Sequence, residues 1–431
     1  MRNRIKHRIV IIIALILSLL FFSNDFSLID IEKTAIIVAL GIDKVDDDIE
    51  ITAQIGVPQA TDQALVNNDT LISAKGKTVM NAIENLSRNS GWFPKLAFCN
   101  VIIIGKTLAY DDVSAITDNL LASEHFQNSA LISVCDGNAK NFLSTPTPLD
   151  SISSFAIQKV LIENGGASSA VMDATIKSFC ESNHGRNACG YMPYLKIKNN
   201  ALGQEDSSSA TTSFYFDKTD DNGLIGGLYD NISLSESDGD SKKGDKEGEN
   251  KNGGGSSGKP TAVFDASETA IFKNGKIADI FSKDETILYN LLHLPADRIV
   301  LPVFAENRKA ALEVFGSRHK ISLSYGVKPQ IVLKLSLTVR ILDESSDDKK
   351  NTLGRRATVP EEFLDSLKKS LTDTANQLTN RMLKKEIDVF GIRNLTYKYH
   401  HKNYEEYKKI PLSDFIVKTE ITVNSHDNIK K

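Results

Sequence analysis

One stretch of the chain, residues 235–259, limits what the rest can fold into. It reads SESDGDSKKGDKEGENKNGGGSSGK and contains no apolar residue. Such a segment cannot bury a core. Because its charges of opposite sign are mixed, a solvated tether or a tolerated loop insertion is favoured over a recognition segment. We therefore interpret residues 201–262 as a flexible Gly/Ser/charged linker and expect one folded region on each side of it.

The N-terminal region, residues 1–24, has the pattern of a membrane anchor or an export signal. A basic cluster at residues 2–8 precedes residues 9–22, which are apolar except for Ser18. Basic residues stay on the cytoplasmic side of a membrane, so we expect the chain after residue 22 to lie outside. The side chains expected to hold the bilayer are Ile9, Ile12, Leu15, Leu19 and Phe22.

Three interpretations of this apolar run compete: an uncleaved anchor, a cleaved signal and a lipoprotein signal. The run is shorter than the roughly 20 residues that cross a bilayer comfortably, and its length fits a cleaved signal. However, it ends in Phe-Phe-Ser-Asn-Asp, without an A-x-A-like cleavage site or a nearby cysteine for lipid attachment. We favour the uncleaved anchor.

Composition and charge indicate a globular protein. The chain has 431 residues, of which 41% are hydrophobic and 25% charged, so it has room for two or three domains. Its formal net charge of −4 gives no sign of the basic face that binding to nucleic acid would need. We therefore expect no nucleic-acid partner.

Motifs for catalysis or metal binding are missing from the sequence. There is no G-x-S-x-G, H-E-x-x-H or P-loop. Cys180, His184 and Cys189 lie close together, but a zinc site needs four ligands at shorter, more regular spacing. A disulfide between Cys180 and Cys189, in a compartment outside the cytoplasm, is a second alternative, although unpaired thiols are favoured. We predict no catalytic residue, no metal, no cofactor and no enzymatic activity.

The region 30–200 alternates strand and helix patterns. Apolar or alternating runs predict strands at 35–43, 49–58, 99–105 and 130–137, and helical periodicity predicts helices at 76–91 and 111–124. The order of these elements indicates an α+β domain in which helices pack on a sheet.

The region 263–426 predicts a second α+β domain. A strand, an Asn-Gly turn and a second strand fit residues 268–280, and residues 331–342 alternate as a half-buried strand does. Thr358 and Glu361 have the spacing of a capping box, which predicts a helix with one apolar stripe after it. An alternating strand at 414–423 closes the domain.

Short motifs occur in a characteristic order along both regions. They are ALGIDK (39–44), ITAQIGVP (51–58), GKTVMNAIENLS (76–87), VIIIGKTLA (101–109), CDGNAKNFL (135–143), TPLDSISS (147–154), ETAIFKNGKI (268–277) and EIDVFGI (386–392). In this order the chain resembles the Ger(x)C family, the C subunits of GerA-type spore germinant receptors. The resemblance covers most of the chain outside the linker.

The motif residues have plain structural roles that we predict from their chemistry. Gly41 and Gly105 are expected to let the chain turn at strand ends. Asp43 is expected to hydrogen-bond its own turn. Asp388, Phe390 and Gly391 are expected to turn the chain after the long helix, with Phe390 in the core.

The resemblance implies a non-enzymatic subunit of a membrane-bound nutrient germinant receptor that helps trigger spore germination. Its partners would be a multi-pass A-type subunit and a transporter-like B-type subunit. The chain itself would lie on the outer face of the inner spore membrane. Family members are similar to three-domain α+β proteins, so one of the two regions would itself be divided. The chain departs from most relatives because it lacks the lipid-acceptor cysteine, so the N-terminal anchor would replace the lipid.

Two other functions stay open. One is an anchored extracytoplasmic receptor or solute-binding protein unrelated to sporulation, which would need a ligand cleft with convergent polar groups. The other is an exported enzyme, which the missing motifs disfavour.

Overall fold

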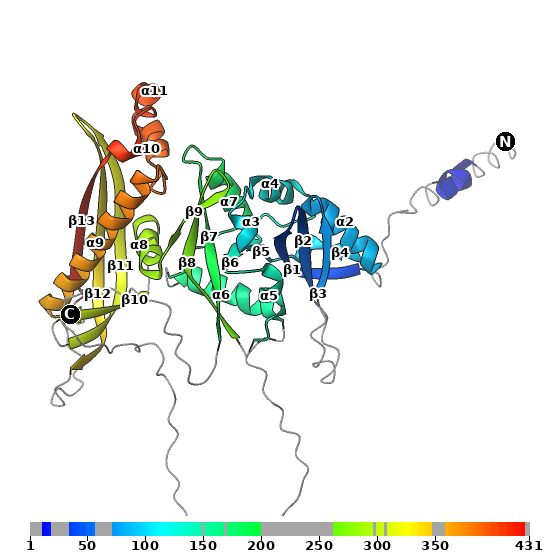
Figure 1. The fold of residues 1–431 in the computed structure, drawn as a ribbon, viewed down its shortest axis with the longest axis horizontal. Coiled ribbons are helices and arrows are strands. Elements are labelled where there is room, and N and C mark those ends of the chain that lie inside the picture. Colours follow the sequence, from blue (N-terminus) through cyan, green and yellow to red (C-terminus); the bar gives the residue numbers. More distant parts are fainter. Residues whose placement is uncertain are drawn as a thin grey trace, which may run out of the picture.

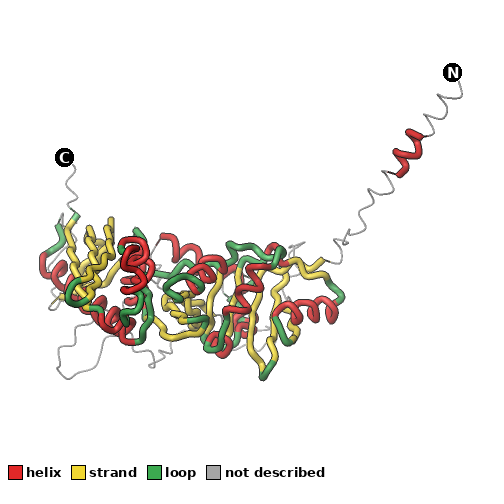
Figure 2. The backbone as a smooth tube through the Cα atoms, turned by 90° about the horizontal axis from the view of Figure 1, so that it is seen from above, coloured by secondary structure: helices red, strands yellow, loops and turns green. Residues whose placement is uncertain are grey.

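The computed structural model describes residues 11–18, 34–56, 71–147, 150, 152–167, 170–199, 262–295, 299–305, 308–346 and 358–426. The anchor residues Ile9, Leu19 and Phe22 lie outside them, as does the linker 201–262 except its last residue. The described residues form a mixed α+β fold built on two sheets that lie side by side along the long axis (Figures 1 and 2).

The larger sheet has nine strands in the order β3-β2-β1-β5-β6-β7-β8-β9, with β4 beside β1. The contacts from β1 through β5 and β6 to β7 are parallel, whereas β1–β2, β2–β3, β7–β8 and β8–β9 are antiparallel. The strands are β1 (Thr34–Val45), β2 (Asp48–Ile55), β3 (Leu71–Gly76), β4 (Phe93–Lys95), β5 (Val101–Gly105), β6 (Leu131–Cys135), β7 (Cys189–Asn199), β8 (Ala262–Lys273) and β9 (Lys276–Phe281).

Helices cover both faces of the larger sheet. Ile102 and Ile104 of β5 face one core, which α2 (Val79–Ser90), α4 (Ser114–Ala122) and α7 (Ile176–Asn183) help to build. The alternate residues Val101 and Ile103 face a second core, under α5 (Ala139–Ser144) and α6 (Ser153–Ala167). The short helix α3 (Lys106–Ala109) and the 3₁₀ turn η2 (Leu96–Phe98) complete this unit. A central strand buried on both faces explains the uninterrupted apolar run of β5.

The linker does not separate the two sheets, contrary to the expected organisation. We expected the second domain to begin at residue 263, but β8 pairs antiparallel with β7, and β9 pairs with β8. Residues 200–261 therefore connect neighbouring strands of one sheet. The predicted hairpin is confirmed: Asn274 and Gly275 have φ values of 51° and 77°, as a type I′ turn requires.

The smaller sheet has the order β10-β11-β12-β13. Its strands are β10 (Ile299–Ala305), β11 (Arg308–Tyr325), β12 (Pro329–Ser346) and β13 (Ile416–Ser425). The alternation predicted for residues 331–342 is confirmed, because Leu333, Leu335, Leu337 and Val339 are buried. The long helix α9 (Glu361–Lys384) covers this buried face with Leu367, Leu371, Leu378 and Met382. The helices α10 (Ile392–Tyr399) and α11 (Tyr404–Tyr407), with the 3₁₀ turns η3 (His401–Asn403) and η4 (Leu412–Asp414), connect α9 to β13.

The predicted capping box before α9 is wrong. The helix begins at Glu361 with Pro360 as its N-cap, and no side chain caps it. A proline restricts the residue before it to extended backbone, so Val359 cannot take the helical conformation that a start at Thr358 requires.

Helix α8 (Lys283–His293) joins the two sheets (Figure 1). Its residues from Thr286 to Leu292 are all buried, which is typical of a helix surrounded by protein. Arg381 of α9 forms a bidentate pair with Glu285 of α8 (2.7 and 2.9 Å) and also contacts Asp279 of β9 (3.0 Å). These contacts connect the C-terminal unit to the last strand of the larger sheet.

At the N-terminus, residues 11–18 form a helix whose apolar side chains are exposed, Ile12 and Leu15 among them. Within the described ranges, no helix is both long enough and apolar enough to span a membrane.

Candidate functional site

The motif residues of the N-terminal region meet at the carboxyl ends of β1 and β5. The backbone N–H groups of Ala139 and Lys140 donate to the two carboxylate oxygens of Asp43, at 2.8 and 3.1 Å. Asp43 thus caps the first turn of α5, 96 positions along the chain, instead of bonding its own turn as we expected. Burial raises the pKa of the Asp43 carboxyl, although both of these hydrogen bonds act in the opposite direction.

Both motif glycines provide space in this cluster, and of the two Gly105 alone lies at a strand end, where β5 passes into α3. Gly41 lies within β1, and a Cβ there would be 3.0 Å from the Cβ of Ala139. A Cβ on Gly105 would be 2.0 Å from Oδ1 of Asp43. The sequence shows the glycines, but their purpose depends on a helix that follows much later in the chain.

A buried glutamine ties two more motifs to the same place. The Gln54 side chain donates to the carbonyl of Leu143 (3.2 Å) and accepts the N–H of Ser154 (3.1 Å). It therefore holds the end of α5 against the start of α6. The role of Gln54 was not predicted, and its position within the motif ITAQIGVP is the signal that the sequence offers for it.

Asp136 follows the end of β6 at the same edge of the sheet. Ligands of open parallel sheets often bind at the carboxyl ends of strands. Here, however, Asp136 accepts hydrogen bonds from Lys106 Nζ and Tyr194 OH, both at 2.8 Å. The Lys106 ammonium is the main cause of the lowered pKa of Asp136. These groups satisfy one another, which indicates a structural role.

The C-terminal motif forms a second buried cap. The N–H groups of Ile392 and Arg393 donate to the two oxygens of Asp388, at 2.6 and 2.7 Å, so Asp388 caps α10. Burial raises the pKa of Asp388 to about 6. Gly391 has a φ of +71°, which glycine adopts without strain. The Phe390 ring lies in the core, 6.0 Å from the His293 ring and 6.3 Å from that of Tyr289.

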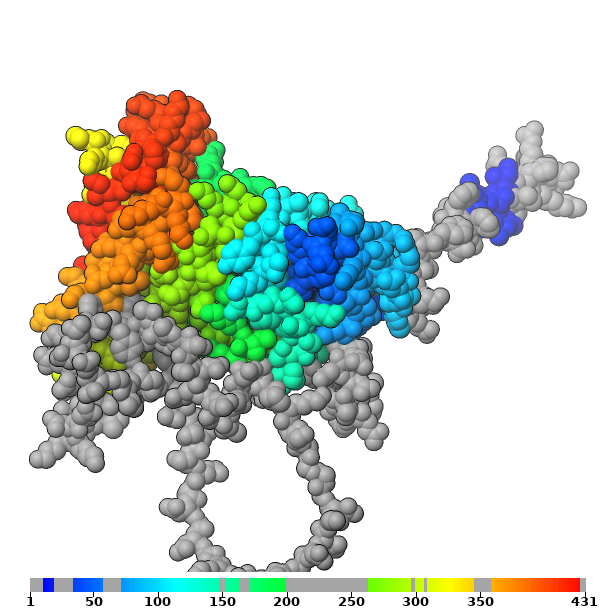
Figure 3. Space-filling model, in the orientation of Figure 1, coloured from blue at the N-terminus to red at the C-terminus, as the bar shows by residue number. Residues whose placement is uncertain are grey.

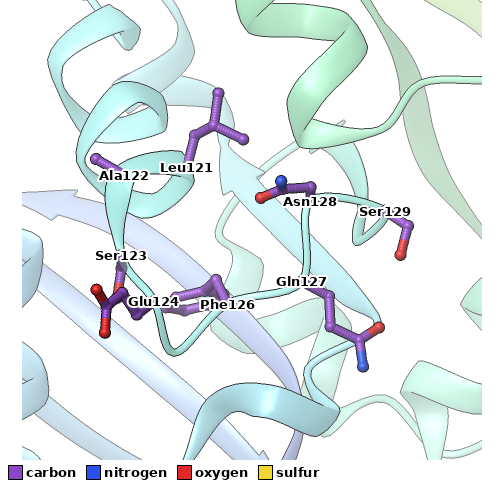
Figure 4. A pocket seen from close by; sticks show the side chains of 8 residues that line it. All are labelled: Leu121, Ala122, Ser123, Glu124, Phe126, Gln127, Asn128 and Ser129. Atoms are coloured by element: carbon purple, nitrogen blue, oxygen red, sulfur yellow. The ribbon is translucent and has the colours of Figure 1, made fainter.

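An open pocket of about 620 Å³ lies between α4 and β6 (Figure 4). Its lining residues are Leu121, Ala122, Ser123, Glu124, Phe126, Gln127, Asn128 and Ser129. Gln127 donates to the carbonyl of Ala97 (2.5 Å). Among these eight residues Glu124 is the sole titratable group, so the lining offers hydrogen bonds but no acid–base pair.

The four cysteines are free thiols and all are buried. Burial raises the pKa of Cys99 to about 12 and that of Cys180 to about 11. Cys180 lies on α7 and Cys189 on β7. Within the part of the chain that the structure describes, no group of three or more His, Cys, Asp or Glu residues could hold a metal ion.

Two family models match the chain in sequence order. The model described as "Spore germination protein N-terminal domain" matches residues 28–197. The model described as "Spore germination B3/GerAC like, C-terminal" matches residues 267–431. A solved structure titled "Crystal Structure of the GerBC protein" is 15% identical and covers 90% of this chain and 97% of its own, with a TM-score of 0.47. No curated protein matches the chain.

Proposed function

The chain belongs to the Ger(x)C family of spore germination proteins, and we propose that it is a subunit of a membrane-bound nutrient germinant receptor. The observation that carries the proposal is the match of both family models, in order, to the two regions on either side of the linker. The motifs that define the resemblance all fall within the same two matched regions.

The subunit acts by binding and not by catalysis. This part of the proposal is supported by the roles of the motif residues. Asp43 and Asp388 are both buried, and each carboxylate accepts two backbone N–H groups at the start of a helix. Residues used in this way maintain the fold on which a binding surface is displayed.

The proposed partners are a multi-pass A-type subunit and a transporter-like B-type subunit. The proposed location is the outer face of the inner spore membrane, with residues 9–22 as an uncleaved anchor. The basic residues before this run and the missing lipid-acceptor cysteine support that arrangement.

Affinity capture from spore membranes tests the proposal. An epitope tag would be inserted within residues 235–259, where the chain has no apolar residue to disturb. We expect the tagged chain to fractionate with the inner membrane and to co-isolate both the A-type and the B-type subunits. The same tag on an unrelated spore membrane protein is the control. Recovery of the chain outside the membrane, or without either subunit, would contradict the proposal.

A further inference from the structure

An exposed apolar edge lies where the N-terminal segment enters the larger sheet. It consists of Ile36, Trp92, Phe93 and Phe98, whose exposed fractions are 37%, 45%, 46% and 50%. Ile36 belongs to β1, Phe93 to β4 and Phe98 to the 3₁₀ turn that follows β4, so three elements contribute. We call these four residues the membrane-contact edge.

Strand pairing places this edge beside the first described residue of the sheet. β4 runs parallel to the start of β1, with Thr34 opposite Phe93 and Ile36 opposite Lys95. Paired strands lie about 5 Å apart. The edge therefore adjoins the point where the N-terminal chain reaches the folded unit, at the end of the molecule that lies away from the smaller sheet (Figures 1 and 3).

The composition of the edge suits the interface of a bilayer. Trp92 is the single tryptophan of the chain. Tryptophan and other large amphipathic or aromatic side chains are favoured at the boundary between headgroups and acyl chains. Lys95, which is exposed between Phe93 and Phe98, can reach lipid phosphates while its stem lies along the apolar surface.

Chain length limits how far the edge can lie from the membrane. If residues 9–22 are in the bilayer, only residues 23–33 separate them from Thr34. Eleven residues span at most about 40 Å when fully extended, and a flexible chain of that length spans roughly 20 Å on average. A partner protein would have to enter this short gap, whereas the lipid surface is already there.

We propose that the membrane-contact edge lies in the interfacial layer of the bilayer that holds the N-terminal segment. This inference rests on the proposed function, in which residues 9–22 are a membrane anchor. The larger sheet then meets the membrane end-on, and the smaller sheet with α10 and α11 is held away from it for contact with other subunits.

The single tryptophan makes the test direct. The full-length chain would be reconstituted into vesicles of phosphatidylethanolamine and phosphatidylglycerol, with or without brominated acyl chains. We expect Trp92 emission to shift to shorter wavelength, to be quenched by the brominated lipid, and to be protected from iodide. Trp92 emission that responds to iodide but not to brominated lipid would overturn the proposal.

Two variants make the result specific. The double variant Phe93→Ser, Phe98→Ser keeps Trp92 as the fluorescent reporter and should restore the quenching of Trp92 by iodide. It should not lower the thermal stability, since both phenylalanine side chains are already half exposed. Val327→Ser is the matched control, because Val327 is fully exposed at the β11–β12 turn of the smaller sheet and should change nothing.

Flotation of the vesicles separates this inference from the anchor. If the chain floats with the vesicles but Trp92 is not quenched, the edge is not in the bilayer and the anchor still stands. If the chain does not float, both are refuted. If Trp92 is protected only in native membranes that contain the receptor subunits, the edge contacts protein and the proposal is wrong. Capture of the receptor subunits tests the proposed function separately.

Discussion

Replacing Gly105 by alanine should destabilise the larger sheet by about 3 kcal/mol, as the sum of two effects. The new Cβ would lie 2.0 Å from Oδ1 of Asp43, so the carboxylate must move by about 1 Å or more before the contact is tolerable. That movement costs roughly 1–3 kcal/mol as overpacking. It also breaks the bonds of 2.8 and 3.1 Å from Ala139 and Lys140, and the lost helix cap costs about 1 kcal/mol more.

Thermal unfolding of the full-length protein in detergent, followed by circular dichroism, measures the effect. A loss of about 3 kcal/mol should lower Tm by roughly 6–12 °C for a unit of this size. Gly316→Ala is the matched control, because a Cβ at Gly316 meets no atom within 4 Å and its φ is not in the left-handed region. The control should leave Tm nearly unchanged.

A double-mutant cycle tests the stated cause. In an Asp43→Ala background the clash is gone, so adding Gly105→Ala should cost much less than it does in the wild type. If Gly105→Ala costs the same in both backgrounds, the carboxylate of Asp43 is not the reason for the glycine, and our account of this cluster is wrong.

Three further predictions concern other parts of the fold. Arg381→Met should lower the free energy of unfolding by about 1–2 kcal/mol in chemical denaturation, because Glu285 and Asp279 lose the partner that they share. The control Arg88→Met removes an exposed ion pair within a helix and should cost under about 0.5 kcal/mol. Equal losses for the two variants would contradict this prediction. Burial raises the pKa of Asp284 to about 7, so the folded chain keeps a proton that the unfolded chain releases above about pH 4. As pH rises from 4 to 7, the Tm of the wild type should therefore fall relative to the Tm of the Asp284→Asn variant. Parallel pH profiles of the two Tm values would refute the raised pKa of Asp284. All four buried cysteines should resist iodoacetamide in the folded protein and react after denaturation, as mass spectrometry would show; fast labelling of the native protein would contradict their burial.

Local patterns in the sequence predicted much of the secondary structure. The strands expected at 35–43 and 49–58 are β1 and β2, and the Asn-Gly signal at 274–275 is the turn between β8 and β9. Strict alternation in β12 and the leucine stripe of α9 also fixed which faces are buried. These features depend on residues within a few positions of one another, which is the information that periodicity carries.

Features that depend on distant partners could not be predicted in the same way. The pairing of β7 with β8 spans the linker, and nothing in the composition of residues 235–259 distinguishes a loop insertion within one sheet from a tether between domains. Similarly, Asp43 and Gly105 were identified from their motifs, but their role depends on α5, which approaches β1 only in the folded chain. The residue type shows which bonds a side chain can form, and the topology decides where the partner is.

The membrane-contact edge is another feature that local sequence patterns could not predict. Trp92 and Phe93 follow the end of α2, and the sequence alone gives no reason to expect them at the surface. Their meaning depends on β4 pairing with the start of β1, directly after the N-terminal segment.

Nutrient-triggered germination of spores that lack this chain tests the central claim most directly. Release of dipicolinic acid would be followed after addition of nutrients, with a direct non-nutrient trigger as the control and with any paralogous receptors deleted. Our account predicts that nutrient-driven release fails while the non-nutrient trigger still works, and that the restored chain rescues release. Normal release in response to nutrients would contradict the assignment of this chain to a germinant receptor.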